Sequence, residues 1–291
     1  MKQAVLLVAH GAPERLEDVE AYLALVRGGR PGSPKILKEV RSRYAAIGGS
    51  SPLLRWTRAQ AEALERSLDL PVFFGMRNWS PFIRDAVEQV RDAGIERLAA
   101  ICLAPQFSES SVGLYIRRTA DAARETGMAA EILWSRGFHD EPLLIEAFAE
   151  RLCPLAGTRR VLFTAHSVPE KVLAGGDPYA RETRATAAAV AARLGLADWD
   201  FAYQSQGMTD DRWLGPTVES RLDQYAAEGL HELVIHPIGF VCDHVEVLFD
   251  IDILFREYAA ARGIAVLRPE SLNDSPTFTA ALAEVARRCL A

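Results

Sequence analysis

The chain has 291 residues, of which 49% are hydrophobic and 25% charged, and its formal net charge at pH 7 is −6. This composition is typical of a globular protein long enough for two ordinary domains, and it excludes a disordered or fibrous chain. The negative charge argues against a protein that binds nucleic acid or an anionic membrane through its overall charge.

Short apolar runs alternate with longer amphipathic stretches along the whole chain. The predicted strands are residues 4–9, 72–74, 98–103, 131–134, 160–164, 201–204, 232–235 and 264–267. The predicted helices are residues 17–26, 54–67, 81–92, 111–126, 142–152, 178–194, 216–228, 244–261 and 277–289. This alternation predicts an α/β protein, in which helices cover both faces of parallel sheets.

The apolar runs also bear on where the protein works. The first run, residues 4–9, ends at His10 and is too short for the core of a signal peptide. No apolar stretch approaches the roughly 20 residues that cross a bilayer. We therefore expect a cytoplasmic protein without integral membrane association.

The two halves of the chain resemble each other. Residues 5–14 (VLLVAHGAPE) and 161–170 (VLFTAHSVPE) are identical at six of ten positions. The segments 104–107 and 236–240 each close a later predicted strand in their own half. The repeat predicts two related α/β lobes, residues 1–153 and 154–271, with the C-terminal helix of about 272–291 folding back on the first lobe.

Two histidines lie where predicted strands end, at His10 and His166. Ligands of open parallel sheets bind beyond the carboxyl ends of the strands, so duplicated lobes would place both side chains on the walls of one cleft. An imidazole there is a base near neutral pH or a metal ligand, although a histidine held only by backbone hydrogen bonds is an open alternative.

Acidic residues follow the predicted strand 232–235. Asp243, Glu246 and Asp250 are three and four residues apart, so we expect their carboxylates to share one helix face. Asp243 also suits a helix N-cap with Glu246 three residues later, which would explain Asp243 but not Asp250. A polar loop at 203–216, which contains Trp213, is of the type that lines sites.

Taken together, these segments resemble the ferrochelatase family along nearly the whole chain. The most specific combination is Ala-His-Ser-Val-Pro at 165–169 with Gly-Phe-Val-x-Asp-His-x-Glu-Val-Leu-x-Asp at 239–250. In all, the matching segments are residues 7–13, 44–52, 104–115, 164–169, 204–215 and 237–252. The resemblance implies two Rossmann-like lobes around a porphyrin cleft, and insertion of Fe²⁺ into a free-base porphyrin.

The resemblance also implies roles for individual residues. His166 would accept pyrrole protons or guide them out, with Glu246 as its acidic partner, and both would contact iron. The chain looks most like the soluble coproporphyrin III ferrochelatases, whose substrate has four propionates. The matching cationic and hydroxyl positions are Arg27, Arg43, Tyr44, Ser51 and Tyr115. Trp213 and Asp250 are secondary candidates.

The sequence departs from the family pattern at several positions. His10 stands where coproporphyrin-type relatives have a tyrosine that ligates iron, which makes His10 a candidate porphyrin contact and axial ligand to product iron. Asn78 replaces a histidine and Leu254 an acid of some relatives, which argues against an outer metal site. The four cysteines form no C-x-x-C pair. We expect reduced, mostly buried thiols, no [2Fe–2S] cluster and no tightly bound cofactor, with Fe²⁺ as a substrate.

Three alternative functions stay open. The substrate could be protoporphyrin IX, the enzyme could insert cobalt or act on another tetrapyrrole, or the protein could be a haem or porphyrin carrier that uses His10 as an axial ligand. Glu246 separates the last case, because a carrier has no use for a buried carboxylate facing the ring. The expected partners are a porphyrin, ferrous iron and, transiently, the next enzyme of haem synthesis, but no nucleic acid.

Overall fold

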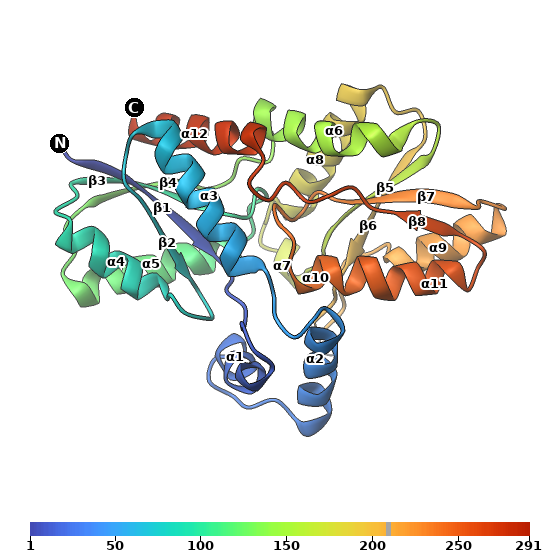
Figure 1. The fold of residues 1–291 in the computed structure, drawn as a ribbon, viewed down its shortest axis with the longest axis horizontal. Coiled ribbons are helices and arrows are strands. Elements are labelled where there is room, and N and C mark those ends of the chain that lie inside the picture. Colours follow the sequence, from blue (N-terminus) through green and yellow to red (C-terminus); the bar gives the residue numbers. More distant parts are fainter. Residues whose placement is uncertain (208–210) are drawn as a thin grey trace.

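The computed structural model describes residues 1–207 and 211–291 and contains two lobes side by side, each built on a four-stranded parallel sheet (Figure 1). The first sheet has the order β2-β1-β3-β4 and consists of β1 (Gln3–Ala9), β2 (Val72–Met76), β3 (Arg97–Cys102) and β4 (Glu131–Ser135). The second has the order β6-β5-β7-β8 and consists of β5 (Arg160–His166), β6 (Trp199–Gln204), β7 (Glu232–Pro237) and β8 (Ala265–Leu267). The predicted two-lobed α/β fold is confirmed.

The sequence repeat corresponds to a structural repeat. β1 and β5 each occupy the second position of their sheet, and the two sheets have the same strand order. His10 directly follows β1 and His166 is the last residue of β5, so the two histidines lie at equivalent places. Residues 4–9 of β1 and 161–165 of β5 are buried throughout, as expected for central parallel strands that are covered on both faces.

Helices cover both faces of each sheet (Figure 1). The helices around the first sheet are α3 (Leu53–Leu68), α4 (Ile83–Asp92), α5 (Val112–Thr126) and α12 (Pro276–Leu290). The helices around the second are α6 (Pro142–Ala156), α7 (Glu170–Leu173), α8 (Tyr179–Leu194), α9 (Val218–Ala227), α10 (Val245–Leu248) and α11 (Arg256–Ala260). The η1 turn (Leu16–Asp18) precedes α1 (Val19–Val26) and α2 (Pro34–Ala46), which project from the body.

Two helices exchange sides between the lobes. α6 precedes the second lobe in the chain and packs on α8 and β7, whereas α12 comes last and returns to α3, β3 and β4 of the first lobe. α12 begins with Ser275, whose hydroxyl accepts a hydrogen bond from the Phe278 backbone N–H at 3.1 Å, and with Pro276 in its first turn. Its buried face joins one apolar core that contains residues of both lobes.

Several local predictions differ from the structure. The predicted helix at 244–261 is divided into α10, a π-helical segment (Asp250–Phe255) and α11, which a 3.6-residue pattern does not reveal. Helix α2 was not predicted; Tyr44 is its one buried residue, and the apolar face that it shares with Leu37 and Val40 is short and only partly buried. α6 continues beyond 152 to Ala156, since Pro154 near its end removes a single helical hydrogen bond.

The capping interpretation of Asp243 was wrong. His244 occupies the N-cap of α10 and makes no side-chain cap. The Asp243 carboxylate instead accepts hydrogen bonds from Ser271 Oγ at 2.8 Å and Asn273 Nδ2 at 2.9 Å and pairs with Arg268 at 3.2 Å. Asp243 therefore ties the loop before α10 to the segment that leads to α12, and it does not share an acidic face with Glu246.

The packing of α12 predicts the effect of a core substitution. Phe278 is fully buried, so we expect Phe278→Ala to lower the free energy of unfolding in urea by about 3–5 kcal/mol. Glu284→Ala on the exposed side of the same helix, where Glu284 pairs with Arg287, should leave the urea midpoint unchanged. Equal midpoints for both variants would show that α12 is not part of the shared core.

Candidate active site

A cavity of about 390 Å³ lies between the lobes, at the carboxyl ends of β1 and β5. Its volume is within the range of about 300–1,000 Å³ that is typical of small-molecule sites. Seven of the ten predicted site residues line it, namely His10, Tyr44, Ser51, Tyr115, His166, Trp213 and Glu246. Arg27, Arg43 and Asp250 are not among its lining residues.

His166 is the last residue of β5 and presents one ring nitrogen to the cavity. Its Nδ1 donates to the backbone carbonyl of Ser167, and its own carbonyl accepts a hydrogen bond from the Tyr179 hydroxyl at 2.9 Å. Nε2 lies 3.4 Å from Glu246 Oε1, and the His166 and Glu246 side chains are 32% and 34% exposed, respectively, so both still face the cavity.

Glu246 lies in α10 between two imidazoles. Its second oxygen, Oε2, is 3.4 Å from Nε2 of His244. His244 Nδ1 donates to the carbonyl of Cys242 at 3.0 Å, and its ring packs on Phe240 at a centroid distance of 4.6 Å. The Glu246 backbone is held by Gln204, whose amide donates to the Glu246 carbonyl at 2.8 Å.

Both imidazoles turn the same ring nitrogen toward the Glu246 carboxylate. Because a backbone carbonyl can only accept, the Nδ1 atoms of His166 and His244 both carry hydrogen, and both Nε2 atoms face the same carboxylate. Burial alone would lower the pKa of His166, but the charge of Glu246 outweighs burial and raises this pKa. Burial would likewise raise the pKa of Glu246, but His166 and then His244 hold this pKa well below its usual range.

His10 has the opposite electrostatic environment. Its Nδ1 lies 3.4 Å from an Arg77 guanidinium nitrogen, and its Nε2 lies 3.1 Å from the Asn78 side-chain amide. Burial, followed by the charge of Arg77, lowers the pKa of His10 to about 3. The His10 ring is therefore neutral at pH 7, and it packs edge-on against Tyr22 at 6.3 Å.

Asp250 and Arg43 form a separate ion pair behind the cavity. Asp250 accepts a hydrogen bond from the Ser205 hydroxyl, and its other oxygen lies 3.6 Å from Arg43. Burial is the main cause that raises the pKa of Asp250 to about 6. Arg43 also pairs with Glu39 at 2.8 Å and lies over the Phe249 ring.

The remaining predicted residues are held by local contacts. Ser51 is buried, and its hydroxyl accepts from the Leu53 backbone N–H at 3.3 Å. Tyr44 packs edge-on against Tyr22. Trp213 lies 6.4 Å from the His166 ring, in the predicted loop 203–216, of which residues 208–210 lie outside the described structure. Arg27 is half-buried at the end of α1.

The sequence interpretation missed several cavity residues, among them Tyr22, Arg77, Gln106, Tyr179 and His244. Arg77 directly follows β2 and lies 4.9 Å from the centre of the Tyr115 ring. The rule that selected His10 and His166, polar residues at the ends of parallel strands, would have selected Arg77 as well. Tyr179 gives no such signal, because it reaches the cavity from a helix start through the tertiary fold.

Within residues 1–207 and 211–291, no three His, Cys, Asp or Glu side chains are already arranged to hold a metal ion. No helix in the described part of the chain is long and apolar enough to span a membrane. Cys102 and Cys242 are buried, but Cys153 is exposed and Cys289 is partly exposed, so the expectation of mostly buried thiols holds for two of the four.

Comparison with known proteins identifies the family. The ferrochelatase family model matches residues 2–290. A ferrochelatase of Acidobacterium capsulatum is 46% identical over 98% of this chain and 94% of its own length. A coproporphyrin III ferrochelatase of Geobacillus sp. is 36% identical over 98% of this chain and 96% of its own.

Solved structures agree with this result at the level of the fold. The sirohydrochlorin chelatase SirB from Bacillus subtilis subspecies spizizenii, in complex with cobalt, superposes with a TM-score of 0.63 at 14% identity, covering 99% of this chain and 95% of that one. At this identity the likeness concerns the two-lobed fold alone. The family match over residues 2–290 and the relatives at 46% and 36% identity show that the chain belongs to the ferrochelatase family.

Proposed function

We propose that this protein inserts Fe²⁺ into coproporphyrin III to form iron coproporphyrin in the cytoplasm, with His166 and Glu246 as catalytic residues. The observation that carries the proposal is the shared proton site at the cavity wall, where two imidazole nitrogens face one carboxylate. The proposed partners are the porphyrin, ferrous iron and, transiently, the next enzyme of haem synthesis.

Metalation requires two pyrrole N–H protons to leave the ring as iron sheds its water. Nε2 of His166 is the proposed acceptor, because the hydrogen bond from Nδ1 to the Ser167 carbonyl leaves Nε2 as the free basic atom. The adjacent Glu246 carboxylate stabilises the imidazolium that forms. Nε2 of His244, which lies beside the other oxygen of Glu246, is the proposed acceptor of a second proton.

The same residues suit a transient contact with iron. Imidazole nitrogen and carboxylate oxygen are acceptable ligands for Fe²⁺, and two such groups without a preformed cage release the ion readily. We propose iron as a substrate, with no resident cofactor and no [2Fe–2S] cluster. The four cysteines support this, because they lie in β3, in α6, after β7 and in α12.

His10 is the proposed contact on the opposite wall and a ligand to product iron. Its low pKa supports this role, because a neutral ring retains a lone pair at pH 7. Both nitrogens are within hydrogen-bond reach of Arg77 or Asn78, so ligation requires that one of these contacts opens. We propose no outer metal site, because the Asn78 amide contacts His10 and Leu254 is an exposed apolar side chain that cannot bind a metal.

The proposed propionate contacts are Tyr44, Ser51 and Tyr115 in the cavity, with Arg27 and Arg43 near it and Trp213 and Asp250 as supporting residues. Further cations lie on the projecting segment beside them. Lys35, Lys38 and Arg41 are exposed on α2, and no ion pair in the described part of the chain engages them. In a protein with net charge −6, these cations favour a substrate with more carboxylates over protoporphyrin IX.

The alternative functions lack a comparable observation. A carrier has no need for the proton site around Glu246, whereas a metalating enzyme depends on one. The cobalt-bound SirB structure resembles this chain in fold alone, so it lends no support to cobalt insertion.

The proposed role of His166 as proton acceptor predicts that a variant without this imidazole loses metalation activity. We expect His166→Ala to slow conversion of coproporphyrin III by at least about 100-fold in anaerobic stopped-flow absorbance with Fe²⁺, because the general base is gone. His231→Ala, which removes an exposed histidine, should convert the porphyrin at the wild-type rate. Tight porphyrin binding by wild-type protein without any change of the free-base bands would instead favour the carrier.

The coupling of His166 to Glu246 predicts the direction of a pKa change. We expect Glu246→Gln to lower the pKa of His166, because burial then acts without the opposing carboxylate. NMR titration of the His166 ring protons measures this shift. In wild-type protein the rate should fall as pH drops through the raised pKa, since the base becomes protonated. Glu257→Gln, at an exposed carboxylate, is the control. An unchanged pKa of His166 in Glu246→Gln would rule out the proposed stabilisation of the His166 imidazolium by Glu246.

The cations on α2 predict a salt-dependent association rate. We expect the triple variant Lys35→Gln, Lys38→Gln, Arg41→Gln to bind coproporphyrin III about tenfold more slowly at low salt, and to bind protoporphyrin IX almost as fast as wild type. Stopped-flow porphyrin fluorescence gives both rates. The charge-matched control changes Arg58, Arg66 and Arg118 to Gln; these residues are also exposed and make no ion pair with any described residue. Equal slowing in the control would show an effect of net charge without local steering.

A further inference from the structure

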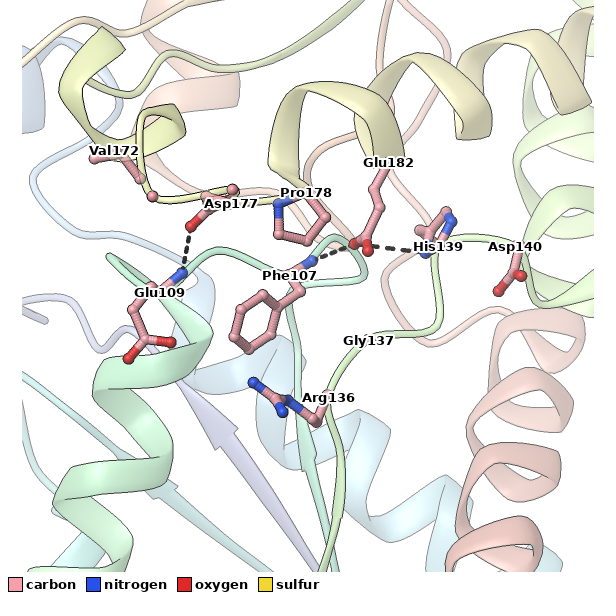
Figure 2. A pocket seen from close by; sticks show the side chains of 12 residues that line it. Phe107, Glu109, Arg136, Gly137, His139, Asp140, Val172, Asp177, Pro178 and Glu182 are labelled. Atoms are coloured by element: carbon pink, nitrogen blue, oxygen red, sulfur yellow. Dashed lines mark hydrogen bonds and ion pairs between the residues drawn. The ribbon is translucent and has the colours of Figure 1, made fainter.

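A second cavity of about 530 Å³ lies between the lobes and shares no lining residue with the candidate active site (Figure 2). Its walls come from the loop after β3, the loop after β4 and the segment that leads into α8. Figure 2 shows the carboxylates of Asp177 and Glu182, both from the second lobe, pointing at backbone nitrogens of the first lobe.

These carboxylates fasten the loop at residues 105–111. Glu182 accepts a hydrogen bond from the Phe107 backbone N–H at 2.7 Å. Asp177 accepts from the Glu109 backbone N–H at 2.7 Å and from the Ser108 hydroxyl at 3.0 Å. Glu182, Phe107 and Ser108 are buried. Buried backbone donors need acceptors, and ionised acceptors give the stronger bonds, so the second lobe fixes the path of this loop.

The fastened loop leads directly into the porphyrin cavity. Ser110 and Ser111 at the end of this loop line that cavity, as does Tyr115 in the first turn of α5. Gln106, which directly precedes Phe107, donates to Thr186 Oγ1 of α8 at 3.1 Å and to the Ile238 carbonyl at 3.2 Å. The position of this cavity wall therefore depends on contacts with α8 and the segment before it.

The same segment of the second lobe also touches the catalytic wall. Asp177 Oδ1 accepts the Tyr179 backbone N–H at 3.0 Å, and the Tyr179 hydroxyl donates to the His166 carbonyl at 2.9 Å. Residues 177–182 thus connect the wall that carries Tyr115 to the wall that carries His166.

We propose that Asp177 and Glu182 are positioning residues, which set the spacing of the two porphyrin walls from behind without touching substrate. The inference rests on the proposed porphyrin site. Loss of either carboxylate frees the loop, so the porphyrin binds more weakly, while the proton site at His166 and Glu246 keeps its own contacts. The signature is a rise in KM for porphyrin with kcat largely retained.

The test compares Asp177→Asn and Glu182→Ala with two matched variants. In Glu182→Gln the one side-chain oxygen that accepts the Phe107 N–H is kept. Asp177 accepts with both oxygens, so in Asp177→Asn the amide NH₂ group faces donors from which it cannot accept. Glu109→Gln removes a charge from the same loop, but its side chain pairs with Arg117 and its N–H still reaches Asp177. Hydrogen exchange of a peptide covering residues 105–111 reports on the loop, and anaerobic metalation of coproporphyrin III gives KM and kcat.

We expect Asp177→Asn and Glu182→Ala to speed amide exchange in this peptide about tenfold and to raise KM by about as much, with kcat within about twofold of wild type. Glu182→Gln and Glu109→Gln should behave as wild type in both measurements. If Asp177→Asn does not fold, Ser108→Ala removes one of its three donors and should give a smaller change in the same direction.

Two results would overturn the inference. Unchanged exchange in Asp177→Asn and Glu182→Ala would show that the carboxylates do not hold the loop. Faster exchange with an unchanged KM, or with a loss confined to kcat, would show that the loop does not set porphyrin binding. A wild-type protein that never metalates would contradict the proposed function alone, because exchange and the porphyrin Kd from fluorescence would still test the positioning role.

Discussion

The site depends on one carboxylate that is shared by two imidazoles. The Glu246 carboxylate is stabilised in a partly buried position because His166 and His244 each place an Nε2 atom 3.4 Å from one of its oxygens. Both rings are fixed from behind by hydrogen bonds to backbone carbonyls, and the carbonyl of Glu246 is held by Gln204. The short α10 and the π-helical segment after it carry Glu246 into this position.

The duplicated fold supplies two histidines with opposite properties. His10 and His166 are equivalent in the two sheets, yet the nearest charge to His10 is the Arg77 guanidinium, whereas for His166 it is the Glu246 carboxylate. One ring is therefore neutral at pH 7 with a pKa of about 3, and the other has a raised pKa. Equivalent places at the ends of two parallel strands thus hold imidazoles in opposite electrostatic environments.

Sequence patterns located the strands and the residues at their ends, because a buried parallel strand is a continuous apolar run and its end is fixed by geometry. They could not locate α2, which is mostly exposed, or the true partners of Asp243, which come from residues 271 and 273. Arg43 likewise pairs with Asp250 and Glu39 through the tertiary fold. Contacts between elements distant in sequence leave no local periodicity.

The lobes form one unit because their helices are exchanged. α6 covers the second sheet and α12 the first, and one core cluster contains Val5 of β1, Phe163 of β5 and Phe278 of α12. Opening the cavity by separating the lobes would expose this core, at a cost proportional to its apolar area. Helices α1 and α2 contribute Tyr22 and Tyr44 to the cavity, and their buried side chains form a small cluster separate from the shared core. Displacing α1 and α2 would therefore expose less apolar surface than separating the two lobes.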